Sequence, residues 1–116
     1  MQLHHIAIVV KNAEASAKFY EKALGLQRIS RPTEGMNSNN GAWFQLGDVQ
    51  LHLQQRDGDQ EKSAQHFAIV AENYEKLVQL VPEYGGRVDE GKPLEGFSRR
   101  CFIYDPDKNR IEVLKK

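Results

Sequence analysis

The sequence predicts an α+β fold built from two tandem β-α-β-β-β modules. The first observation is an internal repeat, because His5-Ile-Ala-Ile-Val9 returns as His66-Phe-Ala-Ile-Val70. Seven of the 21 positions from 5 to 25 are identical to those from 66 to 86, without a gap. The second observation is that each repeat begins with an apolar run of strand length, continues with helical spacing and ends in strand-like alternation. We therefore divide a single domain, 1–116, into a first module over 1–54 and a second over 64–116.

The first module is predicted in detail from its apolar runs and turn residues. A strand covers 3–10, and alternation along it turns His4 away from His5, so His4 is interpreted as a strand-end residue. Asn12 suits the N-cap of a helix through about Ala23, and Gly25 suits its end. The remaining elements are a short strand over 26–30, a polar loop over 31–40, and strands over 42–46 and 49–54 around a tight turn.

The second module follows the same order after a polar linker over 56–62. A strand over 64–71 leads to a helix that Asn73 caps and that Pro82 kinks or ends. Gly85 and Gly86 stop this segment. The remaining elements are a short strand over 87–88, a strand over 98–104, a turn over 105–109 and a strand over 110–114.

The repeat also selects candidate metal ligands. His5 and His66 occupy the same position at the start of each module, and with a one-residue slip His52 and Glu112 correspond in the two last strands. Histidine is the most common metal ligand, and a carboxylate often accompanies imidazole around a divalent ion. These four residues therefore predict a site between two copies of one module, suited to Ni²⁺, Co²⁺, Zn²⁺, Fe²⁺ or Mn²⁺.

Polar and aromatic side chains near these strands are candidates for substrate contact. Gln50 and Gln54 share the face of His52, and this face is too polar for a core. Trp43 and its neighbour Phe44 point to opposite faces, so one lines the cavity while the other packs on a helix.

In the second module, Arg100 and Phe102 share one face of their strand, and the sequence does not decide whether this is the cavity face. Two interpretations of Arg100 stay open, a bidentate contact with an anionic group and a surface arginine beside a loop.

Composition excludes several classes of partner. The 16 basic and 16 acidic residues balance, and without a basic run we expect no nucleic-acid binding. No apolar run approaches the roughly 18 residues that span a membrane, and the early strand pattern argues against a signal peptide. The single cysteine, Cys101, fits a buried thiol in a reducing cytoplasm.

The doubled module resembles the vicinal oxygen chelate superfamily, which includes glyoxalase I, fosfomycin resistance enzymes, extradiol dioxygenases and bleomycin resistance proteins. The resemblance covers essentially the whole chain. The motifs that carry it are Leu3-His-His-Ile-Ala-Ile-Val-Val10, Phe19-Tyr20 with Leu24-Gly25-Leu26, Gln65-His-Phe-Ala-Ile69 and Asp105-Pro-Asp-Lys-Asn-Arg-Ile-Glu-Val113. It implies an open, cup-shaped mixed sheet of the glyoxalase type, with His5, His52, His66 and Glu112 as ligands. The chain departs from the family at Lys108, where glycine is commoner, and at His52, where glyoxalase I usually has Glu or Gln.

The resemblance implies a metal-dependent lyase or isomerase that stabilises an oxyanion of a small oxygenated anionic substrate, with Glu112 as the catalytic base. An iron or manganese dioxygenase, with His52 beside the metal rather than on it, is one alternative. A metal-free binding protein like the bleomycin resistance proteins is another. Members of this size usually form homodimers, and the sequence leaves open whether the two modules pair within one chain or across two.

Overall fold

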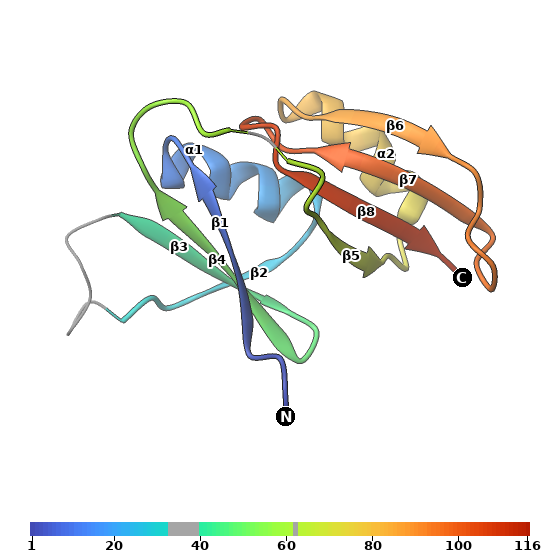
Figure 1. Cartoon of the computed structure of the whole chain (residues 1–116), viewed down its shortest axis with the longest axis horizontal. Helices are drawn as coiled ribbons and strands as arrows, with labels where there is room; N and C mark the ends of the chain where they lie inside the picture. Colours follow the sequence, from blue (N-terminus) through green and yellow to red (C-terminus); the bar gives the residue numbers. More distant parts are fainter. Residues whose placement is uncertain (33–39, 62) are drawn as a thin grey trace. The chain divides into compact units, whose positions relative to one another are not determined.

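The structure is a computed structural model that describes residues 1–32, 40–61 and 63–116. Most of the predicted loop over 31–40, and residue 62 of the predicted linker, lie outside these ranges. The chain divides into two compact units, Met1–Gln60 and Glu61–Lys116 (Figure 1). Each unit holds one four-stranded sheet of parallel and antiparallel strands with few helices, which confirms the α+β class and the two tandem modules. Within the described ranges, no helix is long and apolar enough to cross a membrane.

The first unit forms a sheet in the order β1-β4-β3-β2. The edge strand β1 pairs parallel with β4, while β3 pairs antiparallel with both β4 and β2. The elements are β1 (His5–Val10), α1 (Ala13–Lys18), η1 (Phe19–Ala23), β2 (Gln27–Ile29), β3 (Gly41–Leu46) and β4 (Val49–Gln55).

The predicted helix of the first unit begins and ends where the sequence indicates, but its last turn is wider than expected. The Asn12 side chain accepts a hydrogen bond from the Ala15 amide at 2.9 Å, and Gly25 adopts a left-handed φ of 71°. The segment η1 is a π-helix, closed by a bond from the Leu24 amide to the Phe19 carbonyl at 3.3 Å. Phe19 and the adjacent Tyr20 are both buried in this wide turn.

The second unit repeats the topology in the order β5-β8-β7-β6, with β5 parallel to β8. Three details differ from the sequence prediction, and one is that the strand after the helix covers Arg87–Gly91 rather than 87–88. The first strand starts at Phe67 rather than at Ala64, so His66 directly precedes it, and the Asn73 side chain makes no capping hydrogen bond. The elements are β5 (Phe67–Val70), α2 (Tyr74–Glu83), β6 (Arg87–Gly91), β7 (Arg99–Tyr104) and β8 (Arg110–Lys115).

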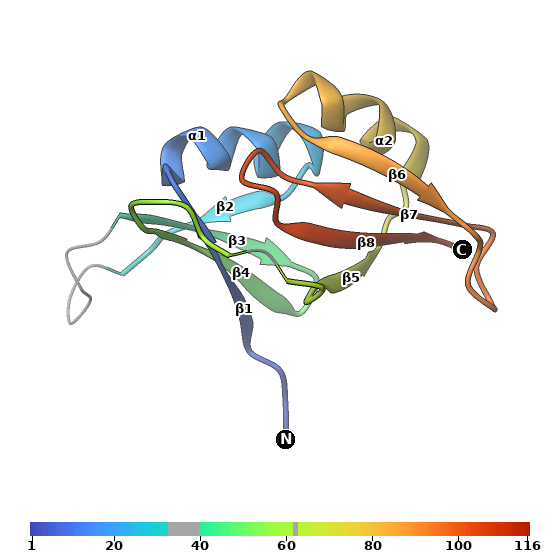
Figure 2. The same ribbon diagram turned by 45° about the horizontal axis from the view of Figure 1, so that its top comes forward.

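In each unit a helix covers one face of the sheet and leaves the other face to a mixture of polar, aromatic and small side chains. Figure 2 shows α1 lying over the first sheet and α2 over the second. Alternation places Leu51 and Leu53 of β4, and Ile111 and Val113 of β8, among the buried hydrophobic residues. Burying such side chains stabilises the fold by about 1.5–3 kcal/mol each, which fixes the strand register. His52 lies between Leu51 and Leu53, and Glu112 lies between Ile111 and Val113. Both residues therefore point to the opposite face.

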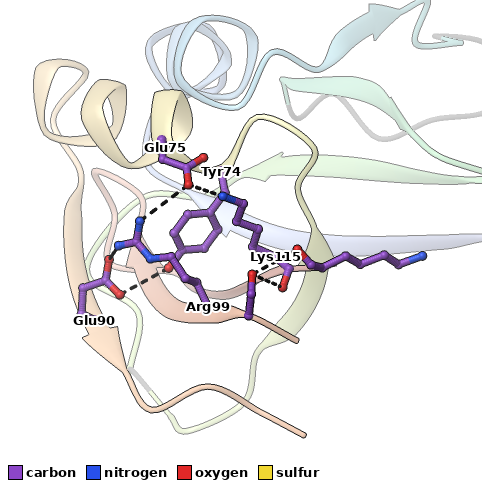
Figure 3. A network of polar contacts seen from close by, with 7 residues as sticks. Tyr74, Glu75, Glu90, Arg99 and Lys115 are labelled. Carbon is purple, nitrogen blue, oxygen red and sulfur yellow. Dashed lines mark hydrogen bonds and ion pairs between the residues drawn. The ribbon is translucent and has the colours of Figure 1, made fainter. Parts of the chain in front are cut away.

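A charged network attaches α2 to the edge of the second sheet (Figure 3). Arg99 Nη2 lies 2.6 Å from Glu90 Oε1 and its Nη1 lies 3.8 Å from Glu75 Oε1, while its guanidinium carbon lies 4.8 Å from the centre of the Tyr74 ring. Lys115 also pairs with Glu75. The network shields Tyr74, and burial raises the pKa of its phenol.

Replacing Arg99 with alanine is expected to lower the free energy of unfolding by about 1–2 kcal/mol. The estimate combines about 0.5–1 kcal/mol for the cation–π contact with about 0.2–1 kcal/mol for each exposed ion pair. Urea unfolding would measure the change, with Lys76→Ala on the exposed side of α2 as the matched control. Equal stability of the two variants would contradict a structural role for this network.

Candidate metal centre

The strand registers place the predicted ligands at equivalent positions of the two units. In the first sheet, Ala7 of β1 pairs with His52, which pairs on its other side with Trp43. In the second sheet, Ala68 of β5 pairs with Glu112, which pairs on its other side with Phe102. Each unit thus has a small residue, a metal-ligating residue type and an aromatic residue in one row. The one-residue slip inferred from the sequence is the register that the strands adopt.

The first unit brings His5 and His52 together in a stack of rings. The two imidazole centres lie 4.1 Å apart at 17°, and Trp43 covers the other side of His52 at 3.7 Å and 2°. Trp43 is therefore the aromatic residue on the candidate-site face. Phe44 is fully buried in the core, where its ring centre lies 6.0 Å from that of Tyr20.

His52 has the electrostatics of a neutral ligand. It is 6% exposed, and burial, reinforced by the nearby His5, His4 and Arg31, lowers its pKa to about 4. At neutral pH the ring is uncharged, so one of its nitrogens has a lone pair. The other, Nε2, donates a hydrogen bond to Gln50 Oε1 at 2.8 Å. Gln54 lies further along the same face of β4 and is exposed.

The prediction that His4 turns away from His5 is wrong. The two Nδ1 atoms lie 2.9 Å apart, so one ring donates a proton to the other. The alternation argument fails because β1 begins only at His5, and His4 lies before the pleated backbone starts. This contact occupies Nδ1 of His5 and leaves Nε2 as the nitrogen that can bind a cation. No sequence pattern indicated this role for His4.

The second unit brings His66 and Glu112 together. His66 Nε2 lies 3.1 Å from Glu112 Oε1, and the Glu112 side chain is only 10% exposed. His66 Nδ1 donates to the carbonyl of Ala64 at 2.9 Å, because a carbonyl can only accept. That bond fixes the ring so that Nε2 faces the carboxylate. Metal-binding histidines are typically held by such a bond from the other ring nitrogen.

Arg100 binds the second carboxylate oxygen of Glu112. Its Nε donates to Glu112 Oε2 at 2.8 Å, and its guanidinium carbon lies 4.7 Å from the centre of the Phe102 ring. The ring of Phe102 also contacts the edge of His66 at 5.4 Å. Arg100 and Phe102 therefore lie on the candidate-site face, whereas the alternate residues Cys101 and Ile103 are buried in the core.

The donor set fits a divalent metal. Imidazole and carboxylate are suitable ligands, His52 is neutral, and His66 Nε2 lies 3.1 Å from Glu112 Oε1, so each unit would offer two donors to such an ion. The structure brings the residues together as two pairs, His5 with His52 and His66 with Glu112, each inside one unit. Among the described residues, no group of three or more His, Cys, Asp or Glu side chains is gathered in one place.

Comparisons with known proteins show the family and the fold. The sequence model of the Glyoxalase/Bleomycin resistance protein/Dioxygenase superfamily matches residues 2–113. Glutathione transferase FosA of Serratia marcescens is 26% identical over 96% of this chain and 78% of its own length. A glyoxalase family protein from Bacillus anthracis matches the structure with a TM-score of 0.82 at 21% identity, covering 100% of this chain and 95% of that one.

A variant of the fosfomycin resistance protein FosX from Listeria monocytogenes matches with a TM-score of 0.80 at 19% identity. The match covers 98% of this chain and 91% of the other, which was solved with Mn(II) and 1S,2S-dihydroxypropylphosphonic acid. At this identity, the structural likeness establishes the fold.

Proposed function

Because this chain belongs to the Glyoxalase/Bleomycin resistance protein/Dioxygenase superfamily, we propose that it is a divalent-metal-dependent enzyme acting on a small oxygenated anion. His5, His52, His66 and Glu112 would hold the ion. The observation that carries the proposal is the contact of His66 Nε2 with Glu112 Oε1, where Glu112 lies in a strand row that repeats the row of His52. When bound, a divalent ion supplies Lewis-acid stabilisation of an oxyanion on the substrate, as in a lyase or isomerase of the glyoxalase type.

The residues around the ligands would orient them and the substrate. Arg100 holds Glu112 Oε2, so the carboxylate presents Oε1 toward the side of His66. We propose that the substrate contacts Gln50, Gln54 and Trp43 of the first unit and Phe102 and the Nη groups of Arg100 in the second. Glu112 would also exchange a proton with the substrate, which requires it to release one of its two present partners.

We further propose a cytoplasmic homodimer. The buried thiol of Cys101 supports a reducing compartment, since burial raises its pKa and keeps it in the unreactive protonated form. The dimer is the usual assembly of superfamily members of this size. Light scattering on the purified protein would measure the mass in solution.

The function is tested by reconstituting the metal-depleted protein with Ni²⁺, Co²⁺, Zn²⁺, Mn²⁺ or Fe²⁺ and assaying each form on oxygenated anions. The panel includes thiohemiacetals. It also includes fosfomycin, because the Listeria relative is named as a fosfomycin resistance protein. We expect turnover with at least one ion and loss of turnover in His66→Ala. Metal-dependent oxygen uptake with catechols would instead assign the dioxygenase reaction, and ligand binding without any metal would overturn the proposal in favour of a binding protein.

A further inference from the structure

A cavity of about 620 Å³ opens at one end of the second sheet, outside the His66–Glu112 pair. It is lined by the end of β7, the start of β8, the turn between them and the start of β6. The volume is within the range of small-molecule sites, roughly 300–1,000 Å³. Its lining residues include three cationic side chains, Arg87, Lys108 and Arg110, and one carboxylate, Asp105.

The single carboxylate offsets only part of this positive charge, and its oxygens are held by its own turn, where it is buried. Asp105 Oδ1 accepts from the amides of Asp107 and Asn109 at 2.9 and 2.8 Å, and its Oδ2 accepts from Asn109 Nδ2 at 2.9 Å. Arg87 is neutralised separately, since its Nη1 binds both oxygens of Asp89. The cations that remain for a ligand are Lys108 and Arg110.

Arg110 has the features of a preformed anion-binding residue. Its guanidinium carbon lies 3.9 Å from the centre of the Phe102 ring, which holds the side chain in one orientation. Its Nε is buried, and within the described residues it has no hydrogen-bond partner. A buried N–H group without a partner is rare in proteins, and an anionic oxygen would satisfy it.

The position of Arg110 relates the cavity to the candidate metal centre. The register aligns Arg110 with Tyr104 and Arg87, two residues along the strands from the row of Glu112 and Phe102. Neighbours i and i+2 on a strand share a face and lie about 6.6 Å apart. A molecule bound to Arg110 can therefore extend along this face to the His66–Glu112 pair.

From this arrangement we propose that the cavity binds the anionic end, phosphate-like or carboxylate, of the small-molecule substrate, with Arg110 as the specificity-determining residue and Lys108 as a second cation. The inference rests on the proposed function only in that it calls the bound molecule a substrate. The anion site itself requires no metal. Lys108 occupies a left-handed position, φ 68°, where glycine is unstrained, so its side chain can be removed without damage to the turn.

Inorganic phosphate titrated into the ¹⁵N-labelled full chain tests the anion site by NMR. We expect saturable shifts of the Gly85, Gly86 and Ser63 amides, all of which line the cavity. Arg110→Gln should weaken phosphate binding about tenfold or more, and Lys108→Gly about threefold. Lys76→Gln, on the exposed surface of α2, is the matched control and should bind as the unmodified protein does.

The same titration in Glu112→Gln separates this inference from the proposed function. We expect phosphate binding to survive in Glu112→Gln and to be weakened in folded Arg110→Gln and Lys108→Gly. This result would support the anion site, even if no metal binds. Absent or non-saturable shifts, or shifts confined to other regions, would overturn the inference. So would a phosphate affinity of Arg110→Gln and Lys108→Gly equal to that of the unmodified protein, even if the metal site is confirmed.

Discussion

Replacing Glu112 with glutamine is expected to lower the affinity for a divalent ion by at least about a hundredfold, because the loss of a ligand should exceed the 10–100-fold cost of losing a supporting residue. The amide removes the negative charge but keeps the shape, and its oxygen can still accept from Arg100. The fold should therefore persist. Competition with a chromophoric chelator would measure the affinity, and thermal unfolding of the metal-depleted protein would check the fold.

Arg100→Gln is the companion variant, since it leaves the four proposed ligands in place. We expect a smaller loss of metal affinity, about 10–100-fold, because Glu112 Oε2 loses its charge-assisted partner. An unchanged affinity in Glu112→Gln would contradict the assignment of this carboxylate as a ligand. An Arg100→Gln variant that binds metal as the unmodified protein does would contradict only the positioning role of Arg100.

Phe44→Ala is expected to have the largest effect on stability, a loss of about 3–5 kcal/mol in the free energy of unfolding. The Phe44 ring is completely buried beside Tyr20, so its removal leaves a cavity. Such a loss is a large share of the about 5–15 kcal/mol that stabilises a typical domain. Urea unfolding followed by circular dichroism would measure it.

The neighbouring substitution Trp43→Ala is the matched test of which face of β3 lies in the core and which lies on the candidate-site side. Trp43 is half-buried on the opposite face, so we expect a smaller loss, about 1–2 kcal/mol. Its removal uncovers His52 and should raise the pKa of that imidazole from about 4 toward the ordinary value of 6.5, which NMR can follow. Comparable destabilisation by the two variants, or an unchanged His52 pKa, would contradict the face assignment.

The two-module fold could be predicted because the information for it is local and duplicated. The repeated His-x-Ala-Ile-Val strand and the left-handed Gly25 are signals that a single sequence carries on its own. The details that differed depend on tertiary contacts. In the π-helical last turn both Phe19 and Tyr20 are buried, and β5 starts where its pairing with β8 starts, at Phe67.

The candidate site was predictable for residues that the repeat marks and not for residues that support them. His52 and Glu112 lie in equivalent rows, as the repeat indicates, and His66 contacts Glu112. The role of Arg100 was ambiguous because Arg99 precedes it and either could face the ligands. The register of Phe102 with Glu112 decides the question, and only the paired strands reveal it.

The most direct test of the central claim is the metal stoichiometry of the purified protein, measured by elemental analysis beside His66→Ala and His52→Ala. We predict about one divalent ion per chain, lost in both variants, because the proposed ligand set includes both His52 and His66. Two ions per chain, with each variant losing only one, would show that the pairs act separately. No ion after reconstitution with any of the five metals would contradict the metal centre.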